Sequence, residues 1–240
     1  MVVACHIQMK KAISRRSCLK SLGGLAAAPF LASLSFHNIL RARSSNWPIY
    51  EGPDTPKLCL GISRDADSTR MRMVKQLGVD HVLIGGPKIP WQEQELREII
   101  GRFEANGLKV INMMIGGFPN AIYGREGRDE EIENVQKSLR AAGRVGLPVV
   151  EYNFYAHRLT EGYYMVEGRG GAGYTGYKYE NVKDLPAIPE KGSYRAEELW
   201  ANLTYLLEAI IPVAEESNVR MALHPNDPPV PVYRGVGQPL

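Results

Sequence analysis

The sequence has little cysteine and lacks the short motifs that mark several large enzyme classes. Only Cys5, Cys18 and Cys59 occur among 240 residues, and the first two lie in a basic N-terminal head. Removal of that head would leave no pair for an internal disulfide, so Cys59 is expected to be a buried structural thiol. No CxxC, HExxH or HxH spacing, no Walker A sequence and no GxSxG elbow is present. The sequence therefore does not support a zinc site, a P-loop nucleotide-binding protein or a hydrolase of the kinds that these motifs mark.

A glycine-rich stretch at residues 168–173 formally matches GxGxxG. The dinucleotide-binding fingerprint requires that these glycines follow a strand directly and open a helix. The stretch instead lies inside a long irregular segment, so we do not predict dinucleotide binding.

Charge is distributed unevenly along the chain. The formal net charge is +3, yet residues 1–50 contain seven basic residues and no acidic residue, which leaves 22 basic and 26 acidic residues in the remainder. The body is therefore mildly acidic and carries no basic footprint for nucleic acid. A content of 44% hydrophobic and 23% charged residues is typical of one soluble globular domain.

The basic head has the layout of an export signal. Arg15 and Arg16 form a twin-arginine pair, and an apolar run of 15 residues follows at Leu22–Phe36. This is the pattern of a Tat signal, and the run is shorter than the ~20 residues of a membrane span. We predict a Tat signal at residues 1–40, a polar linker at 41–56, and a periplasmic protein without a stable membrane anchor. An N-terminal membrane anchor is the alternative.

After the linker, apolar strands alternate with amphipathic helices. Strands are predicted at Lys57–Ile62, His81–Ile84, Lys109–Ile115, Val149–Phe154 and Val219–Leu223. Helices are predicted at Asp67–Leu77, Gln92–Ala105, Asp129–Val145 and Ala196–Glu216, with a kink at Pro212. Such alternation indicates an α/β fold with a parallel sheet.

Two parallel architectures fit this alternation, a doubly wound sheet and a (β/α)8 TIM barrel. Glycine doublets at the ends of the second and third strands favour the barrel. A barrel needs eight strands and typically ~250 residues, whereas residues 57–240 supply about five βα units. We therefore expect a partial TIM barrel at 57–240 that belongs to a longer protein.

One segment, residues 155–194, interrupts the alternation and is rich in glycine and tyrosine; we call it the insertion. Loops of this length are usually functional or disordered, and the aromatic content argues against disorder. The insertion is expected to be irregular and to form either a lid or pocket wall, or a contact between subunits of a homo-oligomer.

The strongest candidate site residue is His224, because it ends a short apolar strand and Pro225-Asn226-Asp227 follows. In TIM barrels the chemistry lies at these C-terminal strand ends. A neutral imidazole there can bind a divalent cation, while Asn226 and Asp227 can orient it or contact substrate hydroxyls. A structural histidine bonded to a loop carbonyl is the alternative.

A second group of polar residues, Glu151 to Arg158, runs off the end of the fourth strand. Strand alternation places Glu151 and Asn153 on one face, which should be the barrel interior because an acid against the helix layer would be costly. Arg158 could hold a carboxylate with two hydrogen bonds. A rim salt bridge among Glu151, Arg158 and Glu161 is the alternative.

Two motifs, Glu151-Tyr-Asn-Phe-Tyr and Met221-Ala-Leu-His-Pro-Asn-Asp-Pro-Pro, resemble the mannonate dehydratase family of xylose-isomerase-like barrels. The likeness runs from about Lys57 to the end of the chain. It implies that His224 is a ligand of Mn²⁺ or of another cation such as Fe²⁺ or Mg²⁺. The better-known dehydratases continue Tyr-Asn-Phe with Met-Pro, where this chain has Tyr155-Ala156, which indicates a divergent branch.

The resemblance implies a lyase that converts D-mannonate, a sugar acid, to 2-dehydro-3-deoxy-D-gluconate. Asn153, Arg158, Asn226 and Asp227 are then the candidate substrate-binding residues, and His157 is a candidate catalytic residue. The other metal ligands and the main catalytic residues are expected beyond Leu240, so this chain alone should be inactive. The alternatives are a related sugar isomerase or epimerase, and a non-catalytic exported sugar-acid binder.

Overall fold

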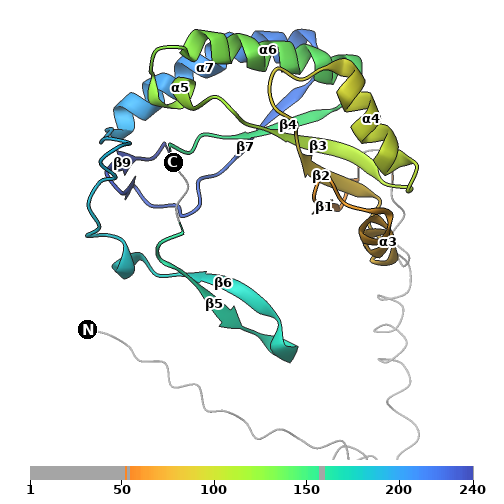
Figure 1. The fold of residues 1–240 in the computed structure, drawn as a ribbon, viewed down its shortest axis with the longest axis horizontal. Helices are drawn as coiled ribbons and strands as arrows, with labels where there is room; N and C mark the ends of the chain where they lie inside the picture. Colours follow the sequence, from red (N-terminus) through yellow and green to blue (C-terminus); the bar gives the residue numbers. More distant parts are fainter. Residues whose placement is uncertain (1–51, 53–54, 157–159, 240) are drawn as a thin grey trace, which may run out of the picture. The chain divides into compact units, whose positions relative to one another are not determined.

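Five short strands form one parallel sheet in the computed structural model, which describes Gly52 and residues 55–156 and 160–239. The predicted export signal and most of the predicted linker lie outside these residues. The strands are β1 (Cys59–Gly61), β2 (His81–Gly85), β3 (Lys109–Ile115), β4 (Val149–Asn153) and β7 (Arg220–His224), in the order β1-β2-β3-β4-β7 (Figure 1). All four pairings are parallel. The five predicted strands and their parallel arrangement are confirmed.

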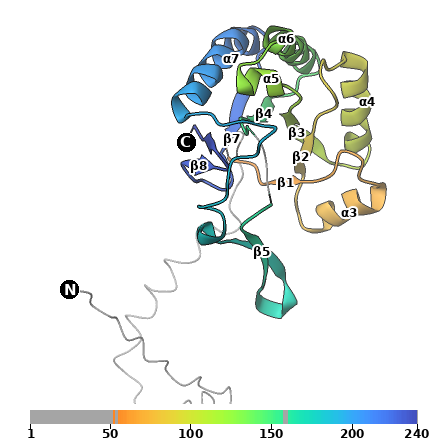
Figure 2. The ribbon, with the colours of Figure 1, turned by 60° about the vertical axis from the view of Figure 1, so that its left-hand side comes forward.

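The helices that connect these strands lie along one face of the sheet. They are α3 (Ser68–Gln76), α4 (Glu93–Glu104), α5 (Pro119–Tyr123), α6 (Arg128–Arg144) and α7 (Ala196–Glu216). Figure 2 shows α3, α4, α6 and α7 following one another around the outer side of the strands. A doubly wound sheet has helices on both faces. Helices on one face are the arrangement of a barrel, and the predicted α/β barrel-type fold is confirmed.

Burial alternates along the strands as this arrangement requires. Val82 and Ile84 in β2 and Val150 and Tyr152 in β4 are buried in a core shared with the helices, whereas the residues between them are half-buried. Because successive side chains point to opposite faces, the half-buried positions share the face without helices. We call this the inner face of the sheet.

The long helix α7 contains Pro212 without ending there. The short helix α5, which the sequence did not predict, begins with Pro119 at a position where the missing amide proton costs no hydrogen bond. Within the described residues, no helix is both long enough and apolar enough to cross a membrane.

The insertion is not irregular throughout, which corrects the prediction. It contains an antiparallel hairpin of β5 (Tyr163–Glu167) and β6 (Gly173–Tyr177), with 3-10 turns η1 (Arg169–Gly171) and η2 (Tyr179–Asn181). Residues 168–172 form the hairpin tip and open no helix of the kind that a dinucleotide motif requires, which agrees with the rejection of that motif. A Cβ atom at Gly176 would lie 2.7 Å from the ring of Tyr164, so this ring packs on the backbone of the partner strand and requires glycine there. A second, two-residue hairpin joins β8 (Val232–Tyr233) to β9 (Val236–Gly237).

Candidate functional site

The predicted site residues of two adjacent strands meet at the C-terminal edge of the sheet. Asn153 at the end of β4 pairs in register with His224 at the end of β7, and Glu151 pairs with Ala222 one step earlier. In a parallel sheet, paired residues point to the same face, so Glu151, Asn153 and His224 all lie on the inner face. The prediction that Glu151 and Asn153 share that face is therefore confirmed.

The His224 imidazole is fixed by the backbone of its own loop. Its Nδ1 atom lies 2.9 Å from the carbonyl oxygen of Pro225. A carbonyl oxygen can only accept a hydrogen bond, so this contact requires the proton on Nδ1. The lone pair of the neutral imidazole is then on Nε2, the atom available to a cation or to an acid. The alternative of a histidine bonded to a loop carbonyl is thus observed, and it is the arrangement that prepares Nε2 as a ligand.

The Tyr155 hydroxyl joins the start of the insertion to residues 224–229, which we call the motif loop. It donates to the Pro225 carbonyl oxygen at 3.0 Å, accepts from the Asp227 amide at 3.1 Å, and lies 3.4 Å from His224 Nδ1. The two rings meet edge to face, with centroids 6.3 Å apart. One hydroxyl therefore bridges both sides of the turn that carries His224.

A second tyrosine of the insertion holds the carboxylate of the motif loop. Tyr163, the first residue of β5, donates its hydroxyl proton to Asp227 Oδ1 at 2.7 Å. Burial and then this hydrogen bond raise the pKa of Tyr163 above its usual range, which keeps the phenol protonated and able to donate. This bond takes one of the acceptor positions of the Asp227 carboxylate and leaves the others for the predicted contact with substrate.

The terminal hairpin is fastened to the same part of the insertion. Arg234 Nη1 lies 2.7 Å from Glu161 Oε1, and the Tyr233 hydroxyl donates to the Glu161 carbonyl oxygen at 2.9 Å. Burial raises the pKa of Tyr233 to about 12. The described partner of Glu161 is therefore Arg234. The predicted rim salt bridge of Glu151, Arg158 and Glu161 stays a prediction, because Arg158 lies outside the described residues.

Glu151 accepts a hydrogen bond from the side chain of Asn112 in β3, with Nδ2 2.5 Å from Oε2. The pKa of the half-buried Cys59 thiol in β1 is raised first by burial and then by the Glu151 carboxylate. The Asn112 Oδ1 atom is buried without a partner among the described residues. Asn112 was missed in the sequence, although a polar side chain inside an apolar strand is a visible signal of such a contact.

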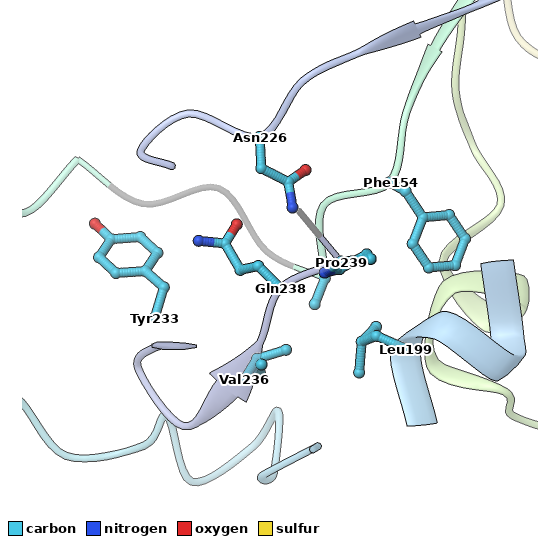
Figure 3. A pocket seen from close by; sticks show the side chains of 9 residues that line it. Phe154, Leu199, Asn226, Tyr233, Val236, Gln238 and Pro239 are labelled. Atoms are coloured by element: carbon cyan, nitrogen blue, oxygen red, sulfur yellow. The ribbon is translucent and has the colours of Figure 1, made fainter. Parts of the chain in front are cut away.

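Asn226 lies at the wall of a small pocket beside the motif loop (Figure 3). The residues that line this pocket include Phe154, Leu199 and Gln238. Asn226 is only 8% exposed, and Figure 3 shows its amide pointing toward Pro239. The cavity has room for about one water molecule, which is far less than a small-molecule site needs. In this arrangement Asn226 therefore faces protein more than an open binding site.

The described residues supply one candidate ligand for a metal ion. His224 has its Nε2 lone pair available, as a ligand requires, but no cluster of three or more His, Cys, Asp or Glu side chains that could hold a metal occurs in the described ranges. A protein cation site normally takes several such ligands. His157 and Arg158, the other two predicted site residues, lie outside the described residues.

Comparison with known proteins gives one consistent family. A family model described as D-mannonate dehydratase (UxuA) matches residues 60–238. Curated proteins named mannonate dehydratase include one from Streptococcus pneumoniae, 31% identical over 171 residues, and one from Thermotoga maritima, 28% identical over 204 residues. These matches cover 60% and 70% of this chain and 46% and 57% of the relatives. The chain thus spans about half the length of these relatives.

A solved structure gives the same result. The crystal structure of mannonate dehydratase from Streptococcus suis serotype 2 is similar with a TM-score of 0.66 and 28% sequence identity. The match covers 76% of this chain and 55% of that chain.

Proposed function

We propose that this protein, which belongs to the D-mannonate dehydratase family, is a lyase that removes water from D-mannonate to give 2-dehydro-3-deoxy-D-gluconate. The family match over residues 60–238 is the observation that carries the proposal, and it confirms the resemblance inferred from the two motifs. The position of the candidate residues supports it, since His224 and Asn153 lie side by side at the C-terminal edge of a parallel sheet, where barrel enzymes carry their chemistry.

His224 is proposed to hold a divalent cation through Nε2, with Mn²⁺ as the first choice and Fe²⁺ or Mg²⁺ as alternatives. The Nδ1 contact with Pro225 supports this role because it fixes the tautomer and the ring orientation. When bound, such a cation supplies a Lewis acid beside the carboxylate and neighbouring hydroxyl of the sugar acid, which makes the C2 proton easier to remove.

The other residues are proposed to bind the substrate and to move its protons. The Asn153 amide, on the same face as His224, can donate to and accept from sugar hydroxyls. Arg158 is proposed to hold the carboxylate. The elimination needs a base for the C2 proton and an acid for the departing C3 hydroxyl, and His157 is a candidate for one of these two roles.

The test is an assay of the full-length protein with Mn²⁺ and D-mannonate, in which formation of the 2-keto-3-deoxy acid is measured. His224→Ala is expected to lower kcat/KM by roughly 10²-fold or more, because loss of a ligand costs more than the ~10–100-fold of an outer-shell change. His81→Ala is the matched control, since His81 begins β2 at the opposite edge of the sheet, and it should keep its activity if it stays folded.

Two other outcomes would contradict the proposal in different ways. Binding of Mn²⁺ by the parent protein without turnover of D-mannonate would point to an isomerase or epimerase of another sugar. Binding of a sugar acid that survives treatment with a chelator, again without turnover, would point to a non-catalytic binder.

A further inference from the structure

The Tyr155 hydroxyl both donates and accepts a hydrogen bond in the motif loop, which an apolar group at the same position could not do. It donates to the Pro225 carbonyl oxygen, which is also the acceptor of the His224 Nδ1 proton, and it accepts from the Asp227 amide. A carbonyl oxygen has two lone pairs and can serve both donors. The phenol therefore fixes the direction of the carbonyl that selects the His224 tautomer.

From this geometry we propose that Tyr155 is a positioning residue that keeps His224 in the Nδ1-protonated form, with Nε2 presented to the cation. The role as a metal ligand rests on the proposed function, whereas the control of the tautomer does not. Tyr155 acts through Pro225 and the motif loop and is not itself a ligand or a catalytic group.

The chain around Tyr155 shows why a side chain is needed for this task. Pro225 follows His224 directly and has no amide proton, so the turn cannot be closed by a hydrogen bond from that residue. Two residues further on, the Asp227 amide donates its hydrogen bond to the Tyr155 hydroxyl, which lies 72 residues earlier in the chain. The turn is therefore closed from outside, by a residue at the first position of the insertion.

The Tyr163 contact strengthens the same connection. Asp227 is bonded at its amide by Tyr155 and at its carboxylate by Tyr163. Both tyrosines belong to the insertion, so the insertion and the motif loop are linked at two points. Movement of the insertion should accordingly change the orientation of His224, so the described contacts of the insertion help to orient this side chain.

The experiment compares Tyr155→Phe with the parent and with Tyr205→Phe in the full-length protein. Tyr205→Phe makes the same chemical change at a hydroxyl that donates to Asp129 Oδ1 at 2.9 Å on the helix layer. Imidazole ¹⁵N chemical shifts, measured where the ring is neutral and assigned with His224→Ala, report the tautomer. Mn²⁺ affinity, measured by electron paramagnetic resonance, reports the availability of Nε2.

The parent and Tyr205→Phe should show His224 with its proton on Nδ1 and the same Mn²⁺ affinity. Tyr155→Phe should shift the ring toward the form with the proton on Nε2 and raise the Mn²⁺ Kd about tenfold, the lower end of outer-shell effects of ~10–100-fold. An unchanged tautomer and Kd in folded Tyr155→Phe would overturn the inference, as would a parent His224 protonated on Nε2.

The tautomer and Mn²⁺ affinity measurements distinguish a failure of the role proposed for Tyr155 from a failure of the proposed function. If the parent binds Mn²⁺ but does not dehydrate D-mannonate, the function fails while the tautomer and Kd comparison still decides the role of Tyr155. If Tyr155→Phe does not fold, Tyr155→Gln, which keeps a donor and an acceptor, takes its place. Tyr155→Gln should also move the His224 proton toward Nε2, by less than complete loss of the polar group would. A parent protein whose His224 carries its proton on Nε2 would still contradict the role proposed for Tyr155.

Discussion

The sheet and the insertion are held in place by different interactions. The strands and helices share one core of buried apolar side chains, in which Leu96, Phe103, Met113, Leu139 and Leu199 are completely or almost completely buried. The insertion contributes one buried apolar side chain among its described residues, Val182, to a separate small cluster. Several of its large side chains are exposed, namely Tyr164, Met165, Tyr174 and Tyr179.

Polar contacts replace the missing core in the insertion. Tyr155 and Tyr163 bind the motif loop, and Glu161 binds Arg234. At the far end of the insertion, the Arg125 guanidinium contacts the Tyr194 hydroxyl at 2.8 Å and lies 4.1 Å from the centroid of the Tyr123 ring. Apolar burial is cooperative over the whole core, whereas each hydrogen bond acts locally. We therefore expect the insertion to open at a lower free energy than the sheet.

The largest effect should come from the core. Leu139 in α6 is fully buried, so Leu139→Ala should lower the free energy of unfolding by about 2–5 kcal/mol through lost burial and the remaining cavity. Leu77→Ala is the control, because Leu77 is 71% exposed and its truncation should change stability by no more than about 0.5 kcal/mol. Urea unfolding measures both, and equal losses in the two variants would refute a single core.

A smaller and local effect is expected for Tyr163→Phe, which removes the hydrogen bond to Asp227. Such a bond contributes ~0.5–1.5 kcal/mol net, so amide hydrogen exchange in β5 and β6 should be roughly fivefold faster while exchange in β3 stays unchanged. Tyr177→Phe is the matched control. Tyr177 is paired with Tyr163 across the hairpin, and its hydroxyl is buried without a partner among the described residues.

Loss of the Tyr177 hydroxyl should be neutral or slightly stabilising, since it removes a buried polar group that forms no bond. Faster exchange across the whole molecule in Tyr163→Phe would show that the insertion and the sheet open together. That result would remove the distinction between the two regions.

The sheet could be predicted because its signals are local. Short apolar runs mark β2, β3 and β4, and the 3.6-residue spacing of apolar side chains marks α4 and α6. The sequence placed Asn153 and His224 at the C-terminal ends of their strands, where barrels carry their chemistry, and the pairing of β4 with β7 brings them side by side. The strands, the helices and the C-terminal strand ends could thus be predicted without knowledge of side-chain contacts.

The insertion and its contacts could not be predicted in the same way. The β5–β6 hairpin exposes side chains on both faces, so it shows no alternation of apolar and polar residues that would mark a strand. The bonds from Tyr155 and Tyr163 to Asp227 span 72 and 64 residues, and no local pattern encodes such a distance. Glu161 likewise bonds Arg234, which is 73 residues away in the sequence.

The smallest effect is expected at the surface of the sheet's helix layer, at Glu93. Hydrogen bonds first from Arg97 and then from Arg144 lower the pKa of this carboxyl. A lowered pKa in the folded state means that the contribution to stability is present above the usual pKa of glutamate and is lost as the pH falls through the folded value. Glu93→Gln should therefore reduce the decrease in melting temperature between neutral and acidic pH.

The effect of Glu93→Gln should be small and should weaken in high salt, because exposed ion pairs are screened by solvent and ions. Glu98→Gln serves as its control. Glu98 lies on the same helix and accepts a hydrogen bond from the neutral Gln94 amide at 2.8 Å, so its replacement should leave the acid dependence unchanged. If Glu98→Gln flattens the melting curve as much as Glu93→Gln does, the two arginines contribute nothing specific. Because α4 belongs to the sheet's core, any change should appear in global unfolding and leave exchange in the insertion untouched.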